Sequence, residues 1–328
     1  MNKIGIIGGG AWGTALAIAV RRSGLQVVIQ AREPEVVEAI NQSHRNPYFL
    51  PHIDLDPAIE ATTDPATATD AVLLVTPAQH LRGVCQTLAP DWPVGVPAVI
   101  CAKGIEQGTC ALMSEVVAET LPGVPFAVLA GPTFAAEVAR DMPTAVTLAS
   151  ADPGLTEKLA AALGTPRLRI YRTGDLIGAQ LGGAVKNVLA IACGIVEGRN
   201  LGQNARAALI TRGLAEIVRL GLAKGAQTDT LMGLSGLGDL TLTCTALQSR
   251  NYSLGVALGR SEALAAILES RASIAEGVFT ASSVTDLARR LDVDMPICTA
   301  IDGVLNHYAD IDATIAGLLS RPFKPEAR

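Results

Sequence analysis

The chain has 328 residues, enough for two domains, and 49% of them are hydrophobic against 17% charged. Its net charge of −5 comes without a long run of either sign and with only 3% aromatic residues, which argues against a nucleic-acid partner. No apolar run reaches about 20 uninterrupted residues, and the N-terminus lacks the cleavage region of a signal peptide. We therefore expect no integral membrane segment and a cytoplasmic protein. Six scattered cysteines and four dispersed histidines favour reduced thiols and no bound metal.

The first half alternates short apolar runs with helix-like stretches, as in a mostly parallel sheet with crossover helices. The runs are continuous, which is typical of strands buried on both faces. They fall at Ile4–Ile7, Val27–Ile29, Ala71–Val75, Ala98–Cys101, Phe126–Leu129, Ala145–Leu148 and Leu168–Tyr171.

After about Asp175 the pattern changes to long segments of helical period that are rich in Ala, Leu and Gly. The short polar stretch 172–175 marks the expected boundary. The fold class is therefore α/β: a Rossmann-type, doubly wound, mostly parallel sheet in domain 1–174, followed by an all-helical domain in 175–328.

A glycine-rich motif follows the first strand directly and opens a helical run. Gly8, Gly10 and Gly13 match G-x-G-x-x-G, with Ala11 and Trp12 between the last two. Gly8 permits a tight turn, Gly10 lets the backbone approach a pyrophosphate, and Gly13 allows close helix packing. The alternative is a strand-to-helix turn without a ligand, but the strand-helix-strand context favours a dinucleotide site.

The end of the second strand bears on which dinucleotide is bound. Arg32 stands where an acidic residue is expected for NADH, and an arginine there suits the 2′-phosphate of NADPH. Glu33, just before Pro34, could simply cap the next helix. We favour NADPH without excluding NADH; a solvated surface charge is the alternative interpretation of Arg32.

Two polar segments follow predicted strands. Lys103 comes after the strand Ala98–Cys101, and Gly131 and Thr133 come after Phe126–Leu129. The carboxyl ends of strands in doubly wound sheets face the ligand crevice, so both segments are candidates for contact with a ligand. A solvated lysine and an ordinary turn are the alternatives.

Lys186 and Asn187 stand near the middle of a predominantly apolar helix, Leu176–Val196. Burial would lower the pKa of the lysine from about 10.4 and suit it to proton transfer. The alternative is a long side chain whose amine reaches solvent.

A further polar group surrounds a glycine-rich segment that we expect to be a flexible turn. Asp239 and Thr243 come from the stretch 234–244, and Ser249, Arg250 and Asn251 follow shortly. An arginine beside free backbone amides can hold a phosphate. Taken singly, these residues are equally consistent with an ordinary loop and a surface arginine.

Together these motifs resemble the bacterial NAD(P)-dependent glycerol-3-phosphate dehydrogenase family. The matching segments are 8–15, 103–104, 130–133, 183–187, 236–240, 249–251 and 276–277. The resemblance implies that Lys186 is the proton donor and acceptor, that Lys103 orients the substrate, and that Asn187, Asp239 and Thr243 complete the pocket. It implies that Ser249, Arg250 and Asn251 hold the substrate phosphate. The implied cofactor-lining residues are Trp12, Arg32, Lys103, Ala135, Arg250, Ile274 and Glu276.

The resemblance also implies reduction of dihydroxyacetone phosphate to sn-glycerol 3-phosphate, a homodimer, and a supply of precursor for glycerophospholipids. One alternative is a related two-domain dehydrogenase acting on a hydroxy acid or a hydroxyacyl thioester, against which the segment 249–251 argues. The other is a non-catalytic NAD(P) sensor, against which Lys103, Lys186 and Asp239 argue.

Overall fold

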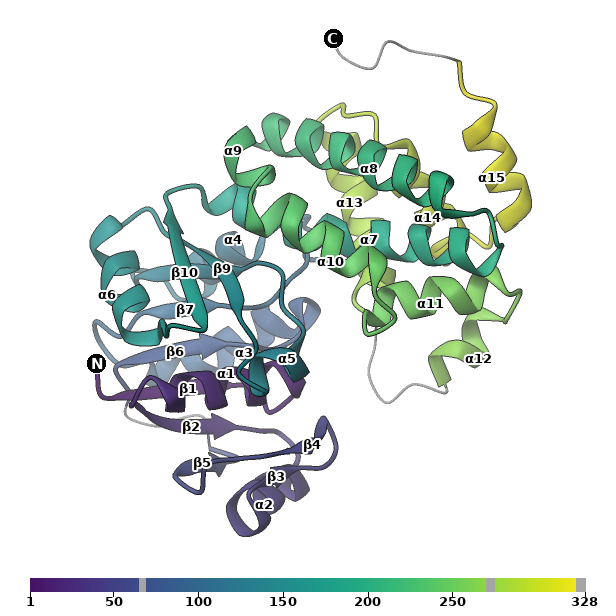
Figure 1. Ribbon diagram of the computed structural model, residues 1–328. Coiled ribbons are helices and arrows are strands. Elements are labelled where there is room, and N and C mark those ends of the chain that lie inside the picture. Colours follow the sequence, from purple (N-terminus) through teal and green to yellow (C-terminus); the bar gives the residue numbers. More distant parts are fainter. Residues whose placement is uncertain (65–68, 270–274, 323–328) are drawn as a thin grey trace.

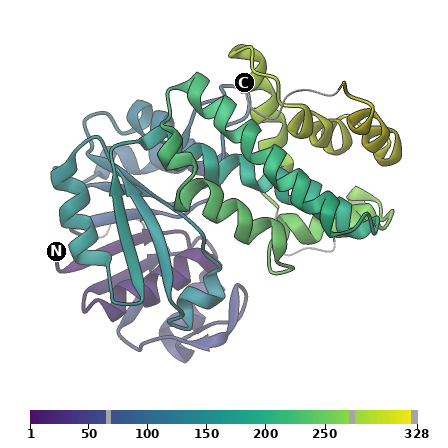
Figure 2. The same cartoon turned by 45° about the horizontal axis from the view of Figure 1, so that its top comes forward.

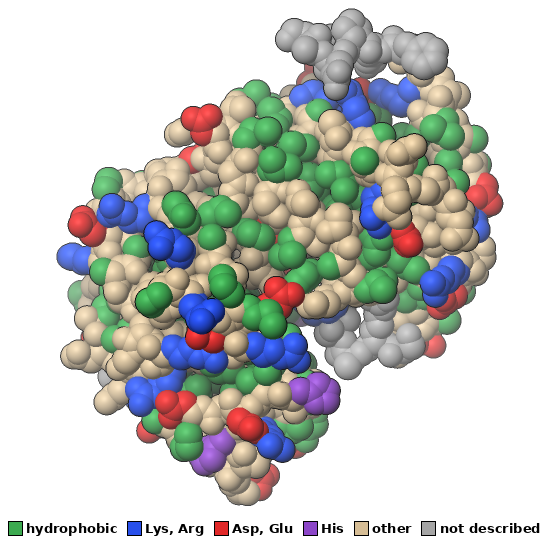
Figure 3. Space-filling model, viewed as in Figure 1, with side chains coloured by type: hydrophobic (Ala, Val, Ile, Leu, Met, Phe, Trp, Pro, Cys, Tyr) green, Lys and Arg blue, Asp and Glu red, His purple; other side chains and the backbone are tan. Residues whose placement is uncertain are grey.

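The structure, a computed structural model, describes residues 1–64, 69–269 and 275–322. A sheet flanked by helices forms the purple-to-teal half, and a group of helices forms the green-to-yellow half (Figure 1). The predicted fold class is thereby confirmed. On the face shown in Figure 3, Lys and Arg side chains lie among Asp and Glu side chains.

Within the described residues, eight strands form the main sheet in the order β10-β9-β8-β7-β6-β1-β2-β5. Neighbouring strands are parallel except β8 and β9, which are antiparallel. The strands are β1 (Lys3–Ile7), β2 (Gln26–Gln30), β5 (Ile59–Thr62), β6 (Ala71–Leu74), β7 (Ala98–Ile100), β8 (Phe126–Ala130), β9 (Thr144–Ala149) and β10 (Leu168–Thr173). All seven predicted runs are strands.

Helices cover both faces of this sheet because its central strands are apolar on both sides. One face packs against α1, α2 and α6, and the other against α3 and α4. The helices of this half are α1 (Ala11–Arg22), α2 (Pro34–Ser43), η1 (Ala78–His80), α3 (Leu81–Leu88), η2 (Ala89–Asp91), α4 (Met113–Thr120), α5 (Ala135–Ala139) and α6 (Pro153–Leu163).

Three of the described strands, β3, β4 and β5, were not predicted from the sequence. β5 is the edge strand, and its exposed Glu60 breaks the apolar run. The antiparallel pair β3 (Arg45–Asn46) and β4 (Leu50–Asp54) is short and largely polar. A sequence pattern finds strands that are buried on both faces more readily than such edge elements.

The helical half is built around α7 (Leu176–Gly198), whose residues 178–196 are buried. Figure 2 shows this half lying beside the carboxyl edge of the sheet. Gly194 of α7 and Gly255 of α11 let the two helices touch, since an added Cβ on either would lie 2.1 Å from the other helix's backbone oxygen. The remaining elements are α8 (Gln203–Lys224), α9 (Thr228–Leu231), η3 (Leu234–Gly238), α10 (Asp239–Thr245), α11 (Arg250–Gly259), α12 (Leu264–Glu269), α13 (Gly277–Arg290), α14 (Pro296–Asn306) and α15 (Ile311–Leu319).

Among the described helices, α7 alone has the length and apolar composition that would suffice to cross a membrane. Its most apolar window is 100% buried inside the protein. In this fold α7 is therefore the central core helix of the second half.

Candidate active site

The site begins at the carboxyl ends of two neighbouring strands. Lys103 lies just beyond β7 and Gly131 directly after β8, and the Lys103 Nζ donates a hydrogen bond to the Gly131 carbonyl at 3.0 Å. Thr133 donates to the same carbonyl at 3.3 Å. Gly131 has a φ of +146°, which side chains rarely adopt, and a Cβ there would lie 3.0 Å from the Cα of Val146. The two predicted segments are thus brought together.

Lys186 enters from the helical half and does not reach solvent, because only 7% of its side chain is exposed. Its Nζ donates to Oδ1 of Asp239 and to Oγ1 of Thr243, the latter at 3.0 Å. Thr243 in turn donates to the backbone carbonyl of Asp239 at 2.6 Å, so its lone pairs remain available to Lys186. Asn187 is buried next to Lys186.

Asp239 joins the two halves of the protein. Its side chain is fully buried, and its Oδ2 accepts a hydrogen bond from Lys103 at 2.8 Å while Oδ1 accepts from Lys186. The Asp239 carboxylate therefore pairs with both Lys103 and Lys186. When both lysines are protonated, these three side chains together carry an excess of positive charge. An anionic substrate would complement that excess.

Burial lowers the pKa of Lys186 to about 8, and the charge of Lys103 acts in the same direction. The Asp239 carboxylate opposes this shift but does not cancel it. A lysine with such a pKa can both give and take a proton near neutral pH.

The prediction of a flexible turn before Asp239 is wrong. Residues 234–238 form the π-helical segment η3, which packs directly on α7. Gly182 makes this possible, because a Cβ there would lie 2.4 Å from the carbonyl oxygen of Ser235. Gly182 precedes Lys186 by one helical turn on the same face, so the close approach brings Asp239 opposite the amine.

The predicted phosphate group lies at the start of α11. The Ser249 hydroxyl caps that helix by accepting from the Tyr252 N–H at 3.2 Å. Asn251 accepts from the Gly277 N–H at 3.0 Å, which ties the start of α11 to the start of α13. Arg250 itself is exposed.

Glu276 lies just before α13 and is partly buried. Burial raises the pKa of its carboxyl, and the Arg250 charge is the largest opposing influence, followed by a backbone hydrogen bond from Ala78. Lys103 and Lys186 also lower this pKa, so Glu276 shares the field of both site lysines.

The glycine motif has the geometry expected of a dinucleotide loop. Gly8 has a φ of +122° and donates to the Gln30 carbonyl at 2.9 Å. A Cβ on Gly13 would lie 1.9 Å from the Gly8 oxygen, whereas a Cβ on Gly10 would meet nothing within 4 Å. The loop is therefore closely packed on one side and open at Gly10, the start of α1.

Two more predicted cofactor residues flank this loop. Ala11 is the first residue of α1, and Ala135 begins α5, which packs against α1. The Nε1 of Trp12 is buried and finds no hydrogen-bond partner among the described residues. Such an unpaired donor and an open glycine edge fit a polar ligand bound at this helix terminus.

Arg32 lies at the end of β2 and is 88% exposed. It forms an ion pair with Glu33 at 2.8 Å, and the Glu33 carboxylate accepts no hydrogen bond from the backbone N–H groups at the start of α2. The interpretation of Glu33 as a side-chain cap is therefore wrong. Ile274, the remaining predicted cofactor residue, lies outside the described residues.

Sequence reasoning missed Asn46. This fully buried side chain on β3 donates to the Gly9 carbonyl and to the Thr14 hydroxyl, each at 2.8 Å. It thereby holds the glycine loop to the β3–β4 pair. Its sequence neighbours Arg45 and Pro47 are typical of an exposed turn and give no sign of burial.

Comparison with known proteins decides the family. The models for the N-terminus and the C-terminus of NAD-dependent glycerol-3-phosphate dehydrogenase match residues 3–156 and 175–316. The chain belongs to the NAD-dependent glycerol-3-phosphate dehydrogenase family. The resemblance stated from the motifs is thus confirmed.

Proteins named glycerol-3-phosphate dehydrogenase [NAD(P)+] from Rhodospirillum rubrum and Caulobacter vibrioides are 59% and 55% identical to the chain. The first match covers 99% of this chain and 94% of the relative, and the second covers 99% of both. A glycerol-3-phosphate dehydrogenase crystal structure from Coxiella burnetii superposes with a TM-score of 0.94 at 37% identity, covering 98% of this chain and 99% of that one. The family resemblance therefore extends over both halves, and the chain is an NAD(P)-dependent oxidoreductase.

Proposed function

We propose that this chain interconverts dihydroxyacetone phosphate and sn-glycerol 3-phosphate, the second of which appears in the names of its relatives. The observation that carries the proposal is the buried carboxylate of Asp239 between Lys103 and Lys186. Reduction of a ketone develops negative charge on oxygen, and preorganised positive charge is the feature that stabilises it.

In this proposal Lys186 is the general acid and base. In the reductive direction its ammonium group protonates the developing alkoxide, and in the oxidative direction its free amine takes the hydroxyl proton. Asp239 and Thr243 hold the amine in place, while Lys103 adds a second positive charge from the sheet edge. Further polar groups of the substrate pocket come from Asn187, Gly131 and Thr133.

The substrate phosphate is assigned to Ser249, Arg250 and Asn251. They lie at the N-terminus of α11, and the N-terminus of a helix favours an anion. Arg250 supplies the charge that a phosphate dianion needs. The charge of Arg250 acts on Glu276, which supports a role of Arg250 toward both phosphate and cofactor.

The cofactor is assigned to Gly8, Gly10 and Gly13, with Ala11, Trp12, Arg32, Lys103, Ala135, Arg250 and Glu276 lining it. When bound, NADPH or NADH supplies the hydride. We favour NADPH because Arg32 is the cation at the end of β2, although Glu33 neutralises it in part. Ile274 is assigned to the same site from the family resemblance alone.

Domain organisation, location and oligomeric state are part of the same proposal. We infer a dinucleotide-binding domain in residues 1–174 and a substrate domain in 175–328, supported by the end of β10 at Thr173 and the start of α7 at Leu176. We also infer a cytoplasmic homodimer that supplies sn-glycerol 3-phosphate for glycerophospholipids, on the strength of the family alone.

The test follows nicotinamide absorbance after adding dihydroxyacetone phosphate, with NADPH and NADH in turn. Lys186→Ala should lower kcat by about 10²–10⁴-fold with cofactor binding retained, and the exposed Lys158→Ala serves as its control. Arg250→Ala should raise KM for dihydroxyacetone phosphate, with Arg260→Ala as control. Normal turnover in Lys186→Ala would refute the proton-transfer role.

A further inference from the structure

Lys103 lies near the start of the loop that connects β7 to α4. Gly104 packs so closely against Ala78 that an added Cβ would lie 2.5 Å from the Ala78 Cβ. Further along, Ile105 and Leu112 form an isolated antiparallel bridge, and the Glu106 N–H donates to the Ala111 carbonyl at 3.0 Å. The loop 104–112 is therefore a closed structure with Lys103 at its base.

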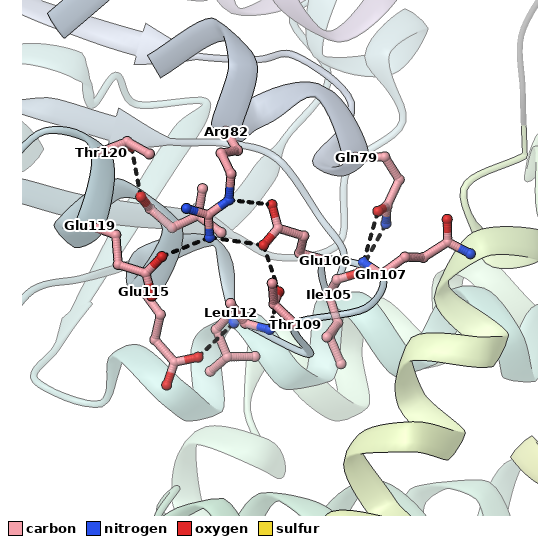
Figure 4. Close-up of polar contacts among 12 residues, drawn as sticks. Gln79, Arg82, Ile105, Glu106, Gln107, Thr109, Leu112, Glu115, Glu119 and Thr120 are labelled. Atoms are coloured by element: carbon pink, nitrogen blue, oxygen red, sulfur yellow. Dashed lines mark hydrogen bonds and ion pairs between the residues drawn. The ribbon is translucent and has the colours of Figure 1, made fainter. Parts of the chain in front are cut away.

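A partly buried ion pair fixes this loop to the sheet half. Arg82 of α3 donates two hydrogen bonds of 2.9 Å to Glu106, one to each carboxylate oxygen (Figure 4). The Thr109 hydroxyl donates to the same carboxylate at 2.6 Å. The guanidinium also reaches Glu119 at 2.7 Å. Only 11% of the Glu106 side chain is exposed, against 57% for Glu119. Such a two-bond geometry defines position as well as energy.

The opposite side of the loop is bound to the helical half. Arg290, at the end of α13, donates to the carbonyls of Gly108 and Thr109 at 2.7 and 2.6 Å. Gln107 points toward the yellow-green helix α13 in Figure 4 and donates to Ser282 at 3.0 Å. Glu276 lies at the other end of α13, directly before its first residue. The loop that follows Lys103 is therefore bound to the helix that Glu276 precedes.

We propose that Glu106 is a positioning residue that acts through Lys103. Held by Arg82 on α3 and, through its loop, by Arg290 on α13, it fixes the backbone from which Lys103 reaches Asp239 across the two halves. The proposal rests on the proposed catalytic role of Lys103. Glu106 is the one carboxylate in the loop 104–112, it is largely buried, and it lies three positions after Lys103.

Glu106→Gln preserves the shape of the side chain and removes the charge that holds Arg82. We expect kcat to fall at least about tenfold, because a small misplacement of a reacting group is costly, with little change in KM for NADPH. The matched control is Glu119→Gln, which contacts the same guanidinium from an exposed position and should keep kcat within about twofold. Equal kcat values for the two variants would overturn the proposal.

A second pair of variants leaves the Arg82–Glu106 ion pair intact. Arg290 and Arg289 are exposed neighbours on α13, but Arg289 forms its ion pair with Asp286 within its own helix. Arg290→Gln should lower kcat severalfold, and Arg289→Gln should not. An unchanged kcat in Arg290→Gln would overturn the role of α13 in holding the loop.

A double-mutant cycle separates this proposal from the role of Lys103. If Glu106 acts through Lys103, adding Glu106→Gln to Lys103→Ala should lower kcat little further. If Lys103→Ala lowers kcat, and Glu106→Gln then lowers kcat of that variant by the same factor as it does in the parent enzyme, the positioning role alone is overturned. Normal turnover of Lys103→Ala would overturn the proposed role of Lys103, and this inference with it.

Discussion

Lys186 and Asp239 form a buried ion pair between α7 and α10, 53 positions apart in the chain. The pair keeps a charged amine inside an apolar helix bundle, while burial still lowers the pKa of that amine to about 8. Two influences on the protonation of Lys186 therefore oppose each other: the Asp239 carboxylate favours the ammonium form, and burial favours the free amine.

The pH dependence of the two reaction directions should follow from this pKa. Reduction needs the ammonium form of Lys186, so its kcat should fall as pH rises through about 8. Oxidation needs the free amine, so its kcat should rise over the same interval. Initial rates measured in both directions at saturating substrates test this, and parallel profiles in the two directions would contradict it.

The strands and the core lysine were predictable because each leaves a local signature. β6 and β7 are buried along their whole length and so show unbroken apolar runs, and Lys186 is conspicuous as a charge within an apolar helix. The partners of these residues leave no such trace. Lys103 and Asp239 are 136 positions apart, and they meet where the helical half packs against the sheet.

Residues that support the site were harder to predict for the same reason. Arg82 and Glu106 look like ordinary surface charges in the sequence, and only the fold shows that they pair beneath the Lys103 loop. Asn46 lies in a polar stretch typical of a turn, yet it is fully buried against the glycine loop. Burial of a polar side chain depends on contacts distant in sequence, which local patterns do not encode.

Cofactor preference should depend on the balance between Arg32 and Glu33. Arg32→Ala should raise KM for NADPH while leaving KM for NADH nearly unchanged, because only NADPH carries the 2′-phosphate. Glu33→Gln frees the guanidinium and should lower KM for NADPH by up to about fivefold, the scale of an exposed ion pair. Equal effects on both cofactors in Arg32→Ala would show that this arginine does not distinguish them.

Asn46 should affect cofactor binding more than turnover. Asn46→Ala leaves the Gly9 carbonyl and the Thr14 hydroxyl without their buried donor, at a cost of about 1–3 kcal/mol in stability. It should raise KM for NADPH and leave kcat at saturating NADPH close to that of the parent. The control is Asn41→Ala, which instead removes the two hydrogen bonds between the Asn41 side chain and the backbone of Ala61 on β5. A comparable rise in KM for the control would point to general loosening of the sheet.

Two glycines of the dinucleotide loop should respond to the same substitution in opposite ways. Gly13→Ala places a methyl group 1.9 Å from the Gly8 oxygen, so it should lower the melting temperature markedly. Gly10→Ala places its methyl group in open space, so the fold should tolerate it, whereas a pyrophosphate approaching the start of α1 should not. Thermal unfolding and NADPH titration of both variants separate the two roles. If Gly10→Ala bound NADPH with the affinity of the parent enzyme, the cofactor would have to lie elsewhere than against Gly10, because among the described residues, its chain neighbours apart, no atom lies within 4 Å of the position of the added methyl group.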